Sequence, residues 1–169
     1  AYVLYVVIEY DRIEDNLVLS VENPIDGKYL EIGESYTAVT YNIGFGAYSP
    51  DFSFFMDSGE MLDGTVVTGK YGKAIDKEHV LKDIAGSVNV LKESKADFIL
   101  VQEADTDADR SYHVDQYAAL KEALSGYSST FAVNFHSAYL MYPLNDHHGK
   151  STAGIATFSA YGIIESVRR

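Results

Sequence analysis

The sequence predicts an α+β fold in which helices and sheets form layers, and two observations lead to this prediction. Segments with strand character flank segments with helical spacing, in the order strand, strand, helix, strand, helix, strand, strand. The 169 residues, of which 47% are hydrophobic and 22% charged, are enough for a domain with its own core. We therefore expect one layered domain and not a disordered chain.

The N-terminal part of the chain contains two predicted strands and one ambiguous segment. The apolar run Tyr2–Ile8 is too short to cross a bilayer, and it fits either a buried strand or the outer end of a membrane anchor. Asn16–Val21 predicts a short strand, and the alternating residues of Tyr36–Ile43 predict a longer one. The segment 45–75, which contains many glycines and shows no sustained period, predicts a long functional or mobile loop.

The central and C-terminal parts predict two helices, each followed by strands. Asp76 is a suitable N-cap for a helix that ends at about Ser94, with an apolar face at helical spacing. The apolar run Phe98–Val101 predicts a strand buried on both faces, and a second helix follows over His113–Ser125. The further predicted strands are Phe131–Phe135 and Gly154–Ser159, and Ile163–Ser166 is a candidate for one more strand at the end of this order. The predicted inward face of the first helix is Val80, Ile84, Val88 and Leu91.

The charge of the chain excludes some classes of function. There are 25 Asp and Glu residues against 13 Lys and Arg, so the formal net charge is −12. This balance argues against a protein that holds nucleic acid through a broad basic surface, but a bound cation would still allow action on a phosphate ester. The chain has no cysteine, which excludes disulfides, thiolate metal sites and cysteine nucleophiles.

Polar side chains at the ends of two predicted strands are the best candidates for a functional site. Asn42 lies at the end of the strand Tyr36–Ile43, and Glu103 lies just beyond Phe98–Val101. Open sheets bind ligands at the carboxyl ends of their strands. Hard cations such as Mg²⁺ prefer oxygen ligands and need only one or two protein carboxylates. Asn42 and Glu103 therefore predict a cation site, although a polar residue after a strand also commonly just begins a loop.

Three segments in a fixed order resemble the N-terminal half of the endonuclease/exonuclease/phosphatase superfamily, which includes DNases, abasic-site endonucleases and sphingomyelinases. They are Thr40-Tyr41-Asn42-Ile43, then Asp97-Phe98-Ile99-Leu100-Val101-Gln102-Glu103, then Gly154-Ile155-Ala156-Thr157-Phe158-Ser159. The resemblance implies a metal-dependent phosphoesterase in a four-layer α-β-β-α sandwich. It implies that Glu103 binds a divalent metal, Mg²⁺ or else Mn²⁺ or Ca²⁺, and that Asn42 helps to hold the metal–phosphate arrangement.

The resemblance also implies that the catalytic machinery is divided between two halves of a domain. The strings that carry the family's general base and catalytic His do not occur in these residues. We therefore expect residues 35–169 to form an N-terminal half that is inactive alone, with the missing C-terminal half as its partner and an exposed sheet face that self-associates. Residues 1–34 are predicted to be an extension, and an extracellular or membrane-anchored location is expected if an anchor precedes it.

Four further residues are candidates for contact with the phosphate-ester substrate. The resemblance places the loop after Glu103 beside the site, so that Asp105 and Arg110 would face a substrate, and it brings His148 and Lys150 towards the same cleft. The alternative for all four is a solvated loop position. The resemblance leaves the substrate open among nucleic acid, lipid and small-molecule phosphate esters. The alternative function is a non-catalytic binding module that retains the fold.

Overall fold

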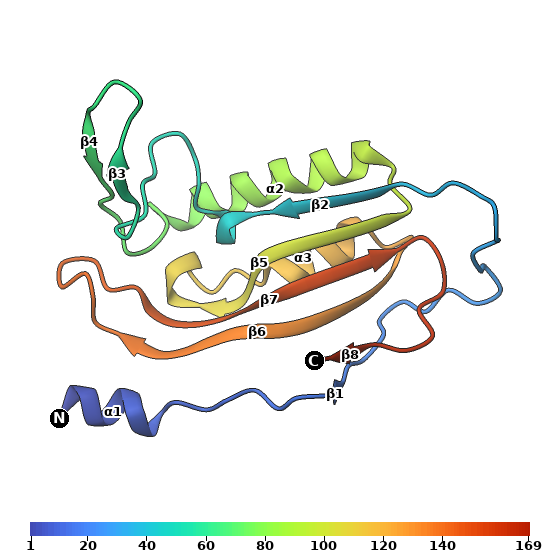
Figure 1. The fold of residues 1–169 in the computed structure, drawn as a ribbon, viewed down its shortest axis with the longest axis horizontal. Helices are drawn as coiled ribbons and strands as arrows, with labels where there is room; N and C mark the ends of the chain where they lie inside the picture. The colour runs from blue at the N-terminus through green and yellow to red at the C-terminus, as the bar shows by residue number, and fades with distance from the viewer.

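A four-stranded mixed sheet forms the centre of the computed structural model, which describes residues 1–169 (Figure 1). Its strands lie in the order β2-β5-β7-β6, where β2 and β5 are parallel and the other neighbours are antiparallel. The mixture of helices and strands confirms the predicted α+β class. The bounds of these strands are Ala38–Asn42 for β2, Phe98–Ala108 for β5, Ser128–Leu140 for β6 and Gly149–Ser159 for β7.

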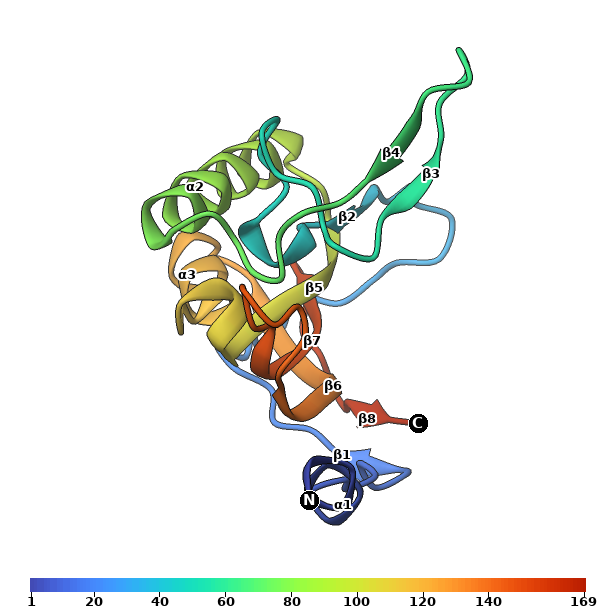
Figure 2. The same ribbon diagram turned by 90° about the vertical axis from the view of Figure 1, so that its left-hand side faces the viewer.

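Two helices, α2 (Lys77–Ser94) and α3 (Gln116–Ala123), cover one face of this sheet (Figure 2). The start of α2 is as predicted, because the Asp76 side chain accepts a hydrogen bond of 2.9 Å from the backbone N–H of His79. Its predicted inward face is confirmed as well. Val80, Ile84 and Leu91 are buried, and Val88 packs against them.

The opposite face of the sheet carries a more polar set of side chains. Apolar residues that face the helices, among them Ile99 and Phe158, are fully buried. On the other face, the registers place Leu100 beside Thr40 and Thr157, and Leu100 is 37% exposed, so the prediction that Phe98–Val101 is buried on both faces is wrong. Self-association through this face stays a prediction.

The N-terminal segment Tyr2–Ile8, for which the sequence left a strand and the end of a membrane anchor open, forms a helix, α1, and the strand alternative is wrong. The hydroxyl of Tyr2 donates to the carbonyl of Tyr139 and accepts from the N–H of Met141, both at 3.0 Å, and the hydroxyl of Tyr5 accepts from the N–H of Tyr139 at 3.1 Å. Tyrosine side chains, and not another strand, therefore occupy this part of the outer edge of β6. No helix in the structure has the length and apolar character needed to cross a membrane.

The predicted strands near the two ends of the chain are corrected by the structure. Only Leu17–Val18 of the predicted strand Asn16–Val21 is extended and paired, as β1. Its antiparallel partner is β8 (Val167–Arg168), whereas the predicted strand Ile163–Ser166 has no regular structure. Such short strands form through a distant partner, which a local residue pattern does not reveal.

Two other predicted segments, a helix and a loop, differ from the structure. The second helix begins at Gln116 and not at His113, because Tyr112 and His113 adopt left-handed φ values of 54° and 56° and Asp115 provides the N-cap. The segment 45–75 contains a hairpin of β3 (Ser58–Glu60) and β4 (Val66–Thr68), which projects from the body of the protein (Figure 2).

Candidate functional site

The parallel strands β2 and β5 bring the side chains of Asn42 and Glu103 together. Asn42 is paired in register with Gln102, so that Glu103 lies one residue further along the neighbouring strand. The side-chain amide Nδ2 of Asn42 donates a hydrogen bond of 2.8 Å to Oε1 of Glu103. The two residues that the sequence places at strand ends are therefore in direct contact.

A β-bulge directs the side chain of Glu103. The pairing of β5 with β7 shifts register between Val101 and Ala104, and Glu103 has a left-handed φ of 57°. Bulges of this kind redirect a side chain relative to the alternation of the strand. A left-handed conformation costs a non-glycine residue on the order of 1 kcal/mol or more, and such residues concentrate at functional sites.

Both polar atoms of the Asn42 side-chain amide form hydrogen bonds. Its Oδ1 accepts a hydrogen bond of 2.8 Å from the backbone N–H of Gly44, while its Nδ2 faces Glu103. Gly44 has a φ of 53°, and a Cβ at this position would lie 2.5 Å from a ring carbon of Tyr48. Glycine is therefore required for the turn that holds Asn42. We conclude that Asn42 positions the Glu103 carboxylate.

Glu103 faces a cleft of about 710 Å³ between the end of β2 and helix α2. Tyr48, which the sequence analysis missed, lines this cleft, and its hydroxyl lies 3.4 Å from Oδ2 of Asp57. Burial, together with the negative charges of Asp57 and Glu103, raises the pKa of Tyr48 to about 12. The hydroxyl is thus neutral at physiological pH and retains a proton to donate.

A second carboxylate, missed by the sequence analysis, enters the cleft from α2. Asp83 lines the cleft beside Lys82, and its Oδ2 is buried without a hydrogen-bond partner. Burial raises the pKa of the Asp83 carboxyl above its ordinary value. The helical pattern identified α2 but gave no signal for Asp83, because a polar residue between apolar positions is typical of any amphipathic helix.

The donor set of the cleft fits a hard divalent cation with few protein ligands. No group of three or more His, Asp or Glu side chains is arranged to hold a metal ion. Mg²⁺ needs only one or two carboxylates when water and phosphate oxygens complete its coordination. Asn42 binds only Oε1 of Glu103, so Oε2 remains available, whereas the Asn42 oxygen already accepts the Gly44 N–H. Glu103 is therefore the better candidate for the ligand.

Asp105 and Arg110, which were predicted to contact substrate, form an internal ion pair. Asp105 has no exposed surface, and it accepts hydrogen bonds of 2.8 and 3.0 Å from the Arg110 guanidinium and of 2.7 Å from the hydroxyl of Ser111. The guanidinium lies 4.1 Å from the centre of the Phe45 ring. The pair therefore supports, from inside, the turn that contains Gly44 and Phe45.

The other two predicted substrate residues do not line the cleft. His148 is buried, and its Nδ1 donates to the carbonyl of Gly72 at 2.6 Å. Burial lowers the pKa of His148. Lys150 is exposed, and its backbone N–H donates to the carboxylate of Asp109 at 2.6 Å. The structure thus brings Asn42 and Glu103 into one cleft and places the other four candidates elsewhere.

Comparison of the chain with the models of known protein families, with curated proteins and with solved structures finds no match.

Proposed function

We propose that this protein is a metal-dependent phosphoesterase in which Glu103 binds the divalent cation. The observation that carries the proposal is the contact between Asn42 and Glu103 at the carboxyl ends of parallel strands, with Glu103 held in a left-handed bulge at the mouth of a cleft. A strained carboxylate facing a cleft is typical of a functional position. The resemblance of the segments around both residues to one phosphoesterase superfamily supports the same reaction class.

The residues of the cleft have different roles in binding. Asn42 orients the carboxylate of Glu103. The neutral hydroxyl of Tyr48, which donates weakly to Asp57, is suited to donate to a phosphate oxygen in place of Asp57. A bound Mg²⁺ would polarise the phosphoryl group and stabilise the charge that develops as water attacks in line. It would also add positive charge to that of Lys82, which lines the cleft, and so favour an anionic ester on a chain with a net charge of −12.

We further propose that a second half of the domain supplies the general base and the paired His. The face of the sheet that carries Leu100 is its proposed docking face, since α2 and α3 occupy the other. A non-catalytic binding module is the alternative function. The burial of Asp105 and Arg110 favours this alternative, because it removes two expected substrate contacts from the cleft.

Hydrolysis by the full-length gene product distinguishes the two functions. The substrates are a soluble phosphodiester and a soluble phosphomonoester, each assayed with Mg²⁺ and with EDTA. We expect turnover that needs the metal and falls by about two orders of magnitude or more in Glu103→Ala. Glu93→Ala, at an exposed position of α2, is the control and should retain wild-type activity. Near wild-type turnover in Glu103→Ala would refute the metal assignment.

A further inference from the structure

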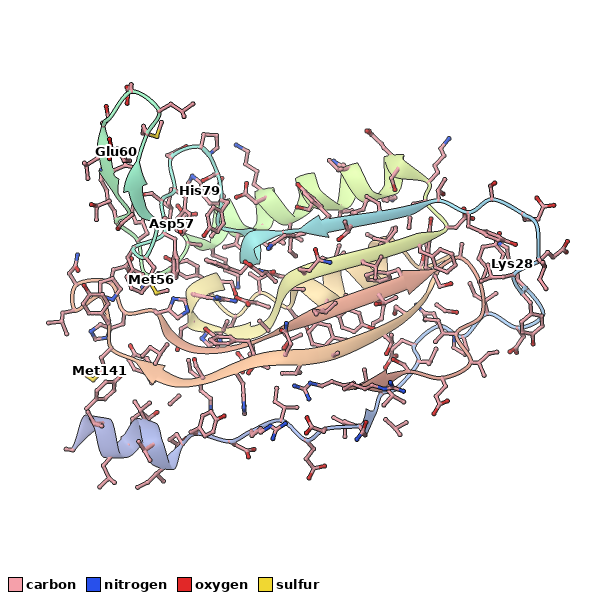
Figure 3. The ribbon with its side chains drawn as sticks, in the orientation of Figure 1. Lys28, Met56, Asp57, Glu60, His79 and Met141 are labelled. Atoms are coloured by element: carbon pink, nitrogen blue, oxygen red, sulfur yellow. The ribbon has the colours of Figure 1, made fainter.

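Exposed apolar side chains gather at one end of the molecule, on three separate segments. These segments are helix α1, the β3–β4 hairpin with the residues before it, and the loop that joins β6 to β7 (Figure 1). The same end faces the viewer in Figure 2, and Met56 and Met141 are both seen there in Figure 3. We call this set the apolar rim; its members are Val3, Leu4, Val7, Ile8, Met56, Met61, Leu62, Val66, Met141, Tyr142 and Leu144.

Direct contacts join the three segments of the apolar rim. The hydroxyl of Tyr2 in α1 accepts from the backbone N–H of Met141 at 3.0 Å. The ring of Tyr142 lies 5.3 Å from the ring of Phe55, which precedes the hairpin. The three segments are therefore held in a fixed arrangement on one side of the protein.

The apolar rim also adjoins the candidate site. Asp57, which follows Met56 and directly precedes β3, is the residue that faces the Tyr48 hydroxyl at 3.4 Å. Strand β2, which ends at Asn42, points towards this same end of the molecule (Figure 1). The rim residue Met56 is therefore connected to the cleft through its neighbour Asp57 and Tyr48.

We propose that the apolar rim inserts into a zwitterionic lipid surface and presents the cleft to a lipid phosphodiester. This inference rests on the proposed phosphoesterase function, to which it adds the class of substrate. Exposed apolar side chains with tyrosines beside them are characteristic of protein segments at the interface of a bilayer, where tyrosine is enriched. Each segment would bury a few side chains and leave its polar neighbours in water.

The shape and the charge of this end both favour zwitterionic lipid. The rim residues lie on a helix, a hairpin and a loop, and the exposed polar residues Glu60 and Asp63 interrupt them in the hairpin, so they offer no continuous flat area for a rigid protein partner. Fluid lipid accommodates such separate segments. With a net charge of −12, the protein would be repelled by anionic lipid headgroups.

Sedimentation with phosphatidylcholine vesicles in EDTA measures this docking without any hydrolysis. The test variant is Leu62→Ser combined with Leu144→Ser, which changes the hairpin tip and the β6–β7 loop at exposed positions. The matched control is Ile32→Ser, an exposed position in the segment that follows Lys28 at the opposite end of the molecule (Figure 3). We expect the wild type and the control to bind equally, and the double variant to bind about 100-fold more weakly, because each leucine contributes about tenfold.

Four results would overturn the inference. They are a wild type that does not bind phosphatidylcholine, a double variant that binds as well as the wild type, tighter binding to anionic vesicles that salt abolishes, and a dimer that the double variant disrupts without any vesicle binding. If the protein hydrolyses a soluble diester but does not bind vesicles, the docking is overturned and the proposed phosphoesterase function remains. Vesicle binding without hydrolysis of any ester would support the docking and overturn the proposed function.

Discussion

Glu103 has an unfavourable backbone conformation, and its carboxylate is the proposed metal ligand of the cleft. Its φ of 57° is strained for any residue with a Cβ, so this conformation lowers the free energy of unfolding. We expect Glu103→Gly to have a free energy of unfolding about 1 kcal/mol higher than that of Glu103→Ala, because glycine adopts left-handed φ values without strain. Both variants lose the hydrogen bond to Asn42, so the comparison isolates the backbone. Equal urea midpoints for the two would show that the bulge is unstrained.

Tyr48 gives the folded protein a specific dependence on alkaline pH. Its pKa rises from an ordinary 10.0 to about 12 on folding. The unfolded chain therefore loses this proton first as the pH rises. The stabilisation by the neutral hydroxyl is complete below pH 10 and is lost between pH 10 and 12. We expect the free energy of unfolding of Tyr48→Phe to fall less steeply over this range than that of the wild type, measured by urea denaturation.

The control for this pH dependence is a tyrosine far from the cleft. Tyr29→Phe changes an exposed side chain in the segment that follows Lys28, and it should show the same alkaline slope as the wild type. If the free energy of unfolding of Tyr48→Phe has the same alkaline slope as that of the wild type and of Tyr29→Phe, the folded protein does not raise the pKa of Tyr48.

At the scale of elements, the end of β5 depends on one internal ion pair. Asp105 is fully buried and accepts three hydrogen bonds from Arg110, so Asp105→Asn leaves the buried guanidinium with a neutral partner. We expect the free energy of unfolding to fall by about 3 kcal/mol or more, as for other broken buried pairs. Asp107→Asn, two residues along the same strand, changes an exposed pair with His113 and should cost less than about 1 kcal/mol. Equal losses in thermal denaturation would contradict a special role for Asp105.

Elements defined by local patterns were predicted well, and elements defined by distant partners were not. Helix α2 follows from its N-cap and its apolar period, which lie within the helix itself. The sequence does not decide the structure of Tyr2–Ile8, because a short apolar run fits a strand or a helix, whereas its hydrogen bonds to the end of β6 are made by the helix. Asn42 and Glu103 were found because strand ends can be recognised in a sequence, whereas Tyr48 reaches the cleft only through the fold of the turn at Gly44.

At the scale of the whole molecule, the net charge of −12 acts on stability in two separable ways. The repulsion among acidic groups is general, and salt at about 0.1 M, with a Debye length of about 10 Å, screens it. A cation at Glu103 would add a local contribution that depends on binding. We therefore expect NaCl to raise the melting temperature of the wild type, Glu103→Gln and Glu93→Gln alike.

Magnesium chloride at the same ionic strength should add a further stabilisation that requires Glu103. A ligand at 100 times its dissociation constant stabilises the folded state by about 2.7 kcal/mol, so a specific site is measurable above the general screening effect. We expect this increment in the wild type and in Glu93→Gln, and its loss in Glu103→Gln, although both variants change the charge by the same amount. If all three proteins respond equally to Mg²⁺ and Na⁺, the cation only screens the acidic surface, and the metal site at Glu103 is refuted.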